Sequence, residues 1–185
     1  MIGPARDPIN RTELVFLLEA VEQAEAAVRA RHKMDTELAH GTTEGFWDAV
    51  ERMLSAAVRV SNIFWPSSNR ARVKRRARML RARFDLANFG AYPDLRNVRN
   101  GFEHIDERID DWADRSGDFY IDLQIDDAPG AGASGIAPSV LESNTARSYN
   151  PQTKVIRVFG ESLSADALAN ELIVLRQHLK DKTGR

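Results

Sequence analysis

Hydrophobic and polar residues follow a helical period over the first two-thirds of the chain. Apolar residues recur every three or four positions, which places them on one side of a helix. Asn10 is a favourable N-cap residue for the first helix. Pro66 disfavours helical geometry in the residue before it and therefore ends the second helix near Trp65. We expect three helices in this part of the chain, at about residues 10–33, 42–65 and 68–86.

A fourth helical segment, LRNVRNGFEHIDERIDDW, runs from Leu95 to Trp112. Its apolar residues are spaced three and four positions apart without interruption, so we expect one continuous helix whose apolar stripe packs into the core. Gly101 lies inside this helix, where glycine costs about 1 kcal/mol relative to alanine. A close approach by another helix, such as that of a symmetry mate, would explain this glycine. The apolar stripe consists of Leu95, Val98, Phe102, Ile105, Ile109 and Trp112.

The period changes after residue 117. FYIDLQI (119–125) alternates apolar and polar residues and TKVIRVF (153–159) is rich in β-branched and aromatic residues, so both segments predict strands. A third short strand at about 145–149 can pair with the second through a turn at Asn150 and Pro151. Glycines and prolines in residues 128–139 predict a flexible loop. Ser164 is then the expected N-cap of a final helix.

Together these segments predict a mainly α protein. We expect an antiparallel helical bundle of four long helices plus a C-terminal helix, with a small antiparallel β insertion around residues 118–160. A chain of 185 residues is long enough for one ordinary domain with its own core. Within a single domain, 1–185, the expected parts are a helical bundle core at 10–116, the β insertion at 117–160 with a flexible loop at 128–139, and a closing helix at 162–182.

Composition limits the chemistry of the chain. It has no cysteine, which excludes disulfides, thiolate metal sites and cysteine nucleophiles. We expect no metal and no other cofactor. The stretch MIGPARDPINR at the N-terminus lacks an apolar signal core, and no apolar run approaches membrane-spanning length. We therefore expect no membrane association and a cytoplasmic location.

A net charge of only −1 conceals a strongly basic segment, NRARVKRRARMLRARF, at residues 69–84. One interpretation is a solvated helix face whose cations pair with acidic residues of neighbouring helices. The other is a surface that binds RNA phosphates without base preference and with strong salt dependence. No aromatic residue is interleaved on the basic face, so stacking of single-stranded bases is not predicted. The candidate RNA-binding residues are Arg70, Arg72, Lys74, Arg75, Arg76, Arg78, Arg81 and Arg83.

The polar side of residues 95–112 contains an ordered motif. Its charge pattern alone is typical of a solvated face with ion pairs between residues three and four apart. Arg99, Asn100 and His104 also form the sequence R-N-x3-H within the predicted helix. This arrangement resembles the signature of the HEPN superfamily (higher eukaryotes and prokaryotes nucleotide-binding domains), in which an arginine, commonly followed by a polar residue, precedes a histidine by several positions. The resemblance covers the helical part, about residues 10–115.

The resemblance implies a metal-independent endoribonuclease, a toxin or defence protein in which two protomers bring their motifs into one cleft. By this analogy Arg99 binds the scissile phosphate, His104 is the acid–base group and Asn100 orients or hydrogen-bonds. Histidine titrates near neutral pH and arginine stays charged, so each residue type suits its task. Glu103 is a further candidate, tuning His104 or crossing the dimer. The implied partners are RNA, a second copy of the chain, and an antitoxin or other protein.

Two rival functions are compatible with the same residues. A non-catalytic interaction or regulatory protein on the same fold would use the charged face as a dimer or partner interface. A nucleic-acid-binding module would use the basic helix alone. Catalysis predicts that Arg99 and His104 converge on a solvent-open cleft, whereas a pure interface predicts that both are buried in ion pairs. Nucleic-acid binding alone predicts that only the 70–83 face matters.

Overall fold

The computed structural model describes residues 9–89, 92–115, 120–125 and 144–183. Within these ranges the chain forms six helices and a sheet of four short strands, which confirms the prediction of a mainly helical protein with a small β part. The predicted flexible loop at 128–139 lies outside the described residues. The helices are α1 (Arg11–His40), α2 (Thr43–Phe64), α3 (Ala71–Phe84), α4 (Pro93–Glu103), α5 (Ile105–Arg115) and α7 (Ala165–Thr183), and the strands are β1 (Gln124–Ile125), β2 (Arg147–Asn150), β3 (Val155–Val158) and β4 (Glu161–Ser164).

Local signals account for several helix ends. Asn10 and Glu13 form the reciprocal capping box at the start of α1, as the N-cap prediction requires. The helix continues beyond its expected end at Lys33, because the first residue that breaks it is Gly41, which adopts a left-handed conformation with φ 71°. Ser164 caps α7 as predicted, its hydroxyl accepting the backbone N–H of Ala167 at 3.2 Å.

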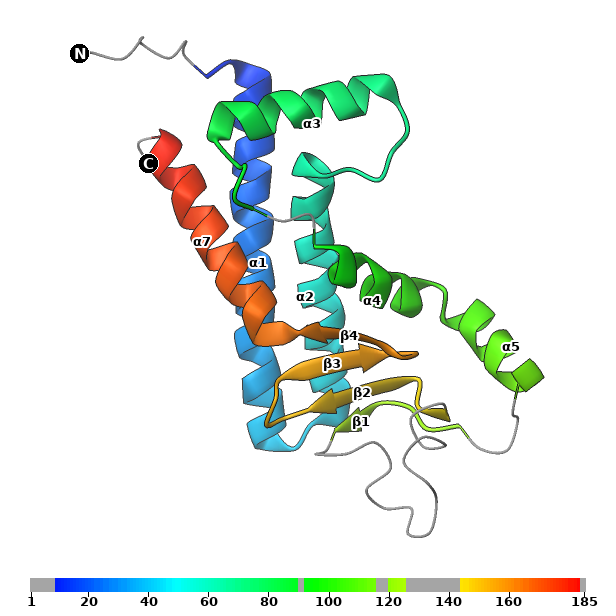
Figure 1. Cartoon of the computed structure of the whole chain (residues 1–185). Coiled ribbons are helices and arrows are strands. Elements are labelled where there is room, and N and C mark those ends of the chain that lie inside the picture. Colours follow the sequence, from blue (N-terminus) through cyan, green and yellow to red (C-terminus); the bar gives the residue numbers. More distant parts are fainter. Residues whose placement is uncertain (1–8, 90–91, 116–119, 126–143, 184–185) are drawn as a thin grey trace.

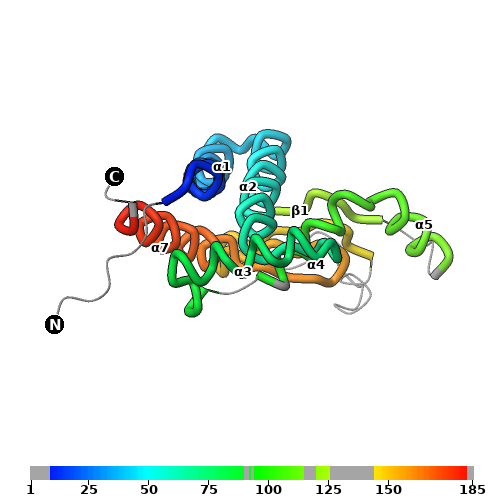
Figure 2. Tube along the Cα trace, turned by 90° about the horizontal axis from the view of Figure 1, so that it is seen from above, coloured from blue at the N-terminus to red at the C-terminus, as the bar shows by residue number. Residues whose placement is uncertain are grey.

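The six helices differ in length and in the elements that they pack against. Helices α1 and α2 run side by side in opposite directions, and α7 packs along α1 (Figure 1). Helix α3 crosses them at the end where α1 begins and α2 finishes, while α4 packs on α2 and the sheet (Figures 1 and 2). Helices α1 and α2 have 30 and 22 residues, but α3 has 14, and the fourth predicted helix is divided into two of 11. The expected bundle of four long helices is therefore not confirmed.

The predicted continuous helix over residues 95–112 is wrong. Helix α4 ends at Glu103, and His104 adopts non-helical angles (φ −111°, ψ 41°) before α5 begins. Leu95 and Val98 are buried as expected, but Ile109 is 37% exposed. The physical reason is that α4 packs against α2, β3 and β4, whereas α5 projects from the body (Figures 1 and 2). Only the first half of the apolar stripe therefore belongs to the core.

Gly101 explains how α4 approaches the sheet. A Cβ atom at this position would lie 2.6 Å from Cγ1 of Val158, a fully buried residue of β3. The close approach that the glycine predicted is therefore real, but the neighbour is a strand of the same chain rather than another helix. The absence of a side chain lets the α4 backbone press against β3.

The sheet has the order β1-β2-β3-β4 and is mixed. The β2–β3 pair is antiparallel as predicted, and the β3–β4 pair is antiparallel too. Strand β1 runs parallel to β2, so the insertion is not wholly antiparallel as expected. A parallel pair requires a connection of about a dozen residues or more, and residues 126–146 separate these two strands. The expected strand at 119–125 is shortened to β1, since Leu123 has a positive φ of 56°. Strand β4 was not predicted. It follows a two-residue turn in which Phe159 and Gly160 both have positive φ, at 48° and 85°.

A buried arginine joins the first helix to the last. Arg31 of α1 is 6% exposed, and its Nε donates to Asp166 of α7 at 2.7 Å. Its other contact is an ion pair with Asp35 at 2.7 Å. Two carboxylates therefore neutralise the buried guanidinium of Arg31. A charged group without such partners would be unfavourable in the protein interior. Across the described ranges, no helix combines the length and apolar character that a bilayer crossing needs.

Candidate nucleic-acid interface

Helix α3 presents its cations outward because its apolar residues face the body. Ala77, Leu80 and Phe84 are buried, as the spacing of the segment predicted. Four of its cations are plainly exposed on the other side: Arg72, Lys74, Arg75 and Arg78. A helix with this division of residues keeps a dense positive charge at the surface.

Three arginines surround the C-terminal end of α2. The last carbonyls of a helix have no partner within it, and this end carries the negative part of the helix dipole. Pro66 prevents the helix from continuing, so these carbonyls need other donors. Guanidinium groups from α3 and α4 supply them. The contacts run from Arg76 to Asn62 (3.3 Å) and Ile63 (3.5 Å), from Arg81 to Phe64, and from Arg96 to Trp65 (2.9 Å).

A groove of about 640 Å³ lies where α3, Arg96 of α4 and the end of α2 meet, and we call it the α3–α4 groove. Four of its lining residues are cations, and in the described part of the chain none of the four has a carboxylate partner within ion-pair distance. Arg81 and Arg96 also bind carbonyls at the end of α2, so Lys74 and Arg78 supply most of the free positive charge. Positive charge without a carboxylate partner in a concave surface attracts anions such as phosphates. The groove is lined by Trp65, Pro66, Asn69, Ala71, Lys74, Ala77, Arg78, Arg81 and Arg96.

The cations of the basic helix could also pair with acidic residues of neighbouring helices. Of the eight candidate RNA-binding residues, one does so in the described part of the chain. Among the described residues, Arg83 forms an ion pair with Glu13 of α1 at 3.9 Å, and no other candidate has a carboxylate this close. Arg76 lies instead over the ring of Phe16, 4.5 Å from its centroid. Most of the positive charge on α3 is therefore uncompensated locally.

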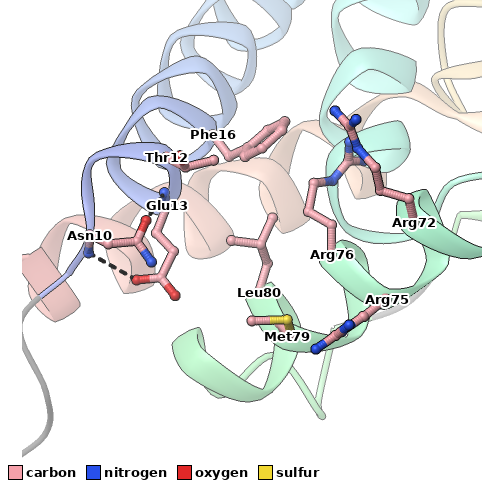
Figure 3. A pocket seen from close by; sticks show the side chains of 9 residues that line it. All are labelled: Asn10, Thr12, Glu13, Phe16, Arg72, Arg75, Arg76, Met79 and Leu80. Atoms are coloured by element: carbon pink, nitrogen blue, oxygen red, sulfur yellow. Dashed lines mark hydrogen bonds between the residues drawn. The ribbon is translucent and has the colours of Figure 1, made fainter.

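A second hollow lies between α1 and α3, on the other side of α3 (Figure 3). It is smaller, about 240 Å³, and Phe16, Met79 and Leu80 form its apolar walls. Glu13 at its edge is already engaged with the backbone of Asn10 (Figure 3). This hollow offers little to an anion beyond the arginines at its rim, so we place the candidate interface at the α3–α4 groove.

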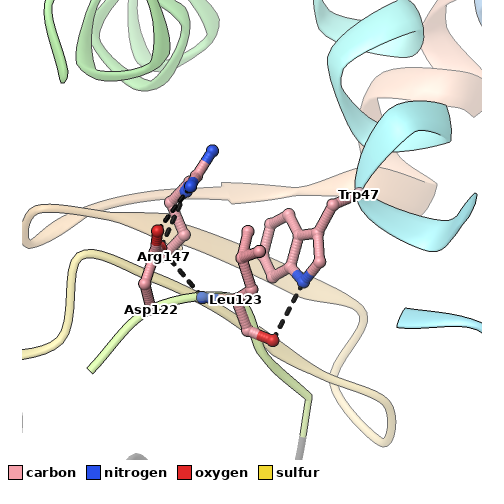
Figure 4. A network of polar contacts seen from close by, with 4 residues as sticks. All are labelled: Trp47, Asp122, Leu123 and Arg147. Carbon is pink, nitrogen blue, oxygen red and sulfur yellow. Dashed lines mark hydrogen bonds and ion pairs between the residues drawn. The ribbon is translucent and has the colours of Figure 1, made fainter. Parts of the chain in front are cut away.

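A polar network holds the sheet edge beside α4 (Figure 4). Arg147 donates to both carboxylate oxygens of Asp122, through Nε at 2.8 Å and through Nη2. Trp47 of α2 donates to the carbonyl of Leu123 at 3.0 Å. The guanidinium also lies 5.5 Å from the ring centroid of Phe102. Since every polar group in this network has a partner within it, we assign it a structural role.

Arg99 is held by its own helix. Its side chain is 28% exposed and forms an ion pair with Glu103, one turn further along α4. Its Nε is buried without a hydrogen-bond partner among the described residues. Burial lowers the pKa of Arg99, and the positive charge of Arg59 on α2 lowers this pKa further. Glu103, which was a candidate for tuning His104 or crossing a dimer, forms its ion pair with Arg99 within this chain.

His104 lies at the break between α4 and α5 rather than in mid-helix. Its side chain is 56% exposed, and Nδ1 is 3.7 Å from a carboxylate oxygen of Glu107. Its backbone N–H donates to the carbonyl of Asn100 at 3.0 Å, and the Asn100 side chain faces solvent. Arg99 and His104 therefore have separate carboxylate partners. Within the described part of this chain they make no hydrogen bond or ion pair with each other.

Two groove residues escaped the sequence analysis. The sequence analysis gave neither Arg96 nor Trp65 a role in RNA binding. Arg96 belongs to α4, and Trp65 follows the end of α2, so the fold is what places both beside the cations of α3. Arg96 lies one turn before Asn100 on α4, which connects the groove to the motif through one short helix.

No cluster of three or more histidine, aspartate or glutamate side chains arranged to hold a metal ion is found in the described ranges. No protein-family model, curated protein or solved structure matches the chain. Its function is therefore inferred from its own residues and their geometry.

Proposed function

We propose that this protein binds RNA in the α3–α4 groove and cleaves it as a HEPN-like, metal-independent endoribonuclease. The observation that carries the proposal is the meeting of Lys74, Arg78 and Arg81 from α3 with Arg96 from the motif helix in one groove. Phosphate contacts supply most of the affinity of a protein for nucleic acid, and cations without local carboxylate partners supply such contacts. The groove therefore fits the backbone of RNA.

Helix α4 links binding to chemistry. Arg96 is in the groove, and Arg99, Asn100 and His104 follow it over about 12 Å of helix axis. A strand that leaves the groove along α4 reaches the motif within a few nucleotides. His104 is exposed there because the helix ends beneath it. Exposure lets the imidazole reach a substrate proton without rearrangement of the core.

The reaction needs one base, one acid and a fixed cation. The 2′-oxygen attacks phosphorus as its proton is taken, the bond to the 5′-oxygen breaks, and the leaving oxygen receives a proton. His104 serves one of these transfers, and His104 from a second copy serves the other, so the proposal includes a homodimer. Arg99 stabilises the charge that develops on the phosphate oxygens after exchanging Glu103 for substrate. A toxin or defence role with a protein antitoxin belongs to the same proposal.

The test is cleavage of a labelled single-stranded RNA in the presence of EDTA. Wild type should cleave, and Arg99→Ala and His104→Ala should each reduce the rate by about 100-fold or more, as loss of an acid–base or charge-stabilising group does. His40→Ala, an exposed histidine at the far end of α1, is the matched control and should cleave as wild type does. Equal residual activity in all four proteins would end the ribonuclease proposal for this motif.

One observation favours the non-catalytic alternative, an interaction protein on the same fold. In this chain Arg99 is partly buried and already paired with Glu103, as that alternative predicts, whereas His104 beside Glu107 is 56% exposed. Replacement of Glu103 separates the two functions. Glu103→Gln releases Arg99, so a ribonuclease should retain or gain activity. An interaction protein should show no RNA cleavage before or after the change.

A further inference from the structure

Trp65 gives the α3–α4 groove an aromatic wall. The residue follows the last turn of α2, lines the groove and is only partly buried. Its aromatic neighbours are Phe64 and Tyr92, with ring centroids 5.7 Å and 5.9 Å away. They are inclined to the indole by 66° and 82°, so neither is stacked in parallel on it. The indole N–H has no hydrogen-bond partner among the described residues.

The surroundings of Trp65 suit a nucleotide in charge and in size. Arg96 donates a hydrogen bond to the carbonyl of Trp65 at 2.9 Å and also lines the groove. Asn69 lies in the same wall, where its Oδ1 accepts from Lys74 at 3.2 Å and leaves its amide N–H groups to donate. The groove volume of about 640 Å³ is that of a site for one small organic ligand. An aromatic ring can stack on a base, an amide can hydrogen-bond to the edge of that base, and the cations can bind the neighbouring phosphates.

We propose that the α3–α4 groove binds one unpaired nucleotide of an RNA strand, with the base stacked on Trp65 and the flanking phosphates on Lys74, Arg78 and Arg96. The RNA ligand rests on the proposed function, whereas the stacked base and the preference for single strands are new. A base within a duplex is already stacked and paired on both sides, so it cannot lie against Trp65. Single-stranded RNA should therefore bind more tightly than duplex RNA of the same sequence.

The test measures fluorescence anisotropy of a labelled single-stranded RNA and of its duplex with the full-length protein. Trp65→Leu should weaken binding of the single strand by at least about fivefold, the lower end of the effect of removing one stacked base, and should leave duplex binding unchanged. Trp65→Phe should fall between wild type and Trp65→Leu. Trp112→Phe, a change on α5 that keeps an aromatic ring beside Tyr120 and loses the indole bond to Asn144, is the control for Trp65→Phe and should bind both RNAs as wild type does.

Intrinsic fluorescence gives a second measurement that does not depend on a leucine variant that folds. Single-stranded RNA should quench the emission of wild type, and this quenching should disappear in Trp65→Phe. Quenching that persists in Trp65→Phe would overturn the stacking inference. The stacking inference would also be overturned if Trp65→Leu bound the single strand as tightly as wild type does while Lys74→Ala bound both RNAs more weakly. In that case RNA binding in the groove stands without stacking, whereas no binding of either RNA by wild type ends both proposals.

Discussion

Replacement of Gly101 by alanine tests how closely α4 packs on the sheet. Two effects of opposite sign compete. Alanine is more favourable than glycine in a helix interior by about 1 kcal/mol. Against this, the new Cβ would lie 2.6 Å from Cγ1 of Val158, well inside the 3.4 Å at which ordinary contacts begin. Overpacking of this kind costs about 1–3 kcal/mol.

The cost of the overlap should exceed the gain in helix propensity, because Val158 has little freedom to move. It is fully buried and β-branched, which restricts its side-chain rotamers. Its strand is hydrogen-bonded to β2 on one side and to β4 on the other. We expect Gly101→Ala to lower the free energy of unfolding by up to about 2 kcal/mol, the difference between the two effects, and the melting temperature by up to about 8 °C for a protein of this size. Urea denaturation followed by circular dichroism measures the change.

Gly45→Ala is the matched control. A Cβ there would lie 2.5 Å from Oε2 of Glu37, so this side chain must move and loosen its contacts with Lys33 and Thr42. Such contacts of a surface side chain contribute little to stability. This variant should be neutral or more stable. In a Val158→Ala background, Gly101→Ala should become stabilising, because the added methyl enters the space that the valine vacates. A rise in stability of Gly101→Ala in the wild-type background would refute the close packing of α4 on β3.

Three further predictions concern stability. Asn10→Ala removes the capping box of α1 and should lower the free energy of unfolding by about 1 kcal/mol in urea denaturation, whereas an unchanged value would contradict the cap. Burial raises the pKa of Tyr92 and of Tyr149, so the folded protein retains protons that the unfolded chain releases; its stability should fall as the pH rises above about 10, and more gradually in Tyr92→Phe. Arg81→Ala should lower the melting temperature because a carbonyl of α2 loses its donor, whereas the exposed Arg78→Ala should weaken RNA binding and leave the melting temperature unchanged.

Elements with local signals were predictable from the sequence. Asn10, Pro66 and Ser164 act on their immediate neighbours, so the first, second and last helices begin or end where those residues place them. The inner side of α3 was equally predictable from its apolar spacing. Each of these features depends on a few consecutive residues, which a sequence displays directly.

Features that depend on distant neighbours were not predictable. The apolar spacing of residues 95–112 continues past His104, but the helix breaks there and α5 leaves the core on which α4 packs. The contacts of α5 include those of Trp112, which donates to Asn144 and packs on Tyr120. Strand β4 depends on a turn in which Phe159 adopts a positive φ, an unusual conformation for a bulky residue.

The candidate site shows the same division. The eight cations of α3 and the R-N-x3-H motif were visible in the sequence, but the groove required Trp65 and Arg96 from two other segments. Arg76 and Arg81 also acquired backbone partners at the end of α2, which no charge pattern displays. Part of the predicted RNA-binding set is therefore also structural.

The salt dependence of RNA affinity tests most directly whether the α3–α4 groove holds phosphates. The logarithm of the association constant for a single-stranded RNA should fall linearly with the logarithm of the salt concentration. Each phosphate contact contributes about −0.7 to that slope, so Lys74→Ala/Arg78→Ala should bind more weakly with a slope shallower by about 1.4. Identical affinities and parallel lines for wild type and the double variant would contradict RNA binding in this groove.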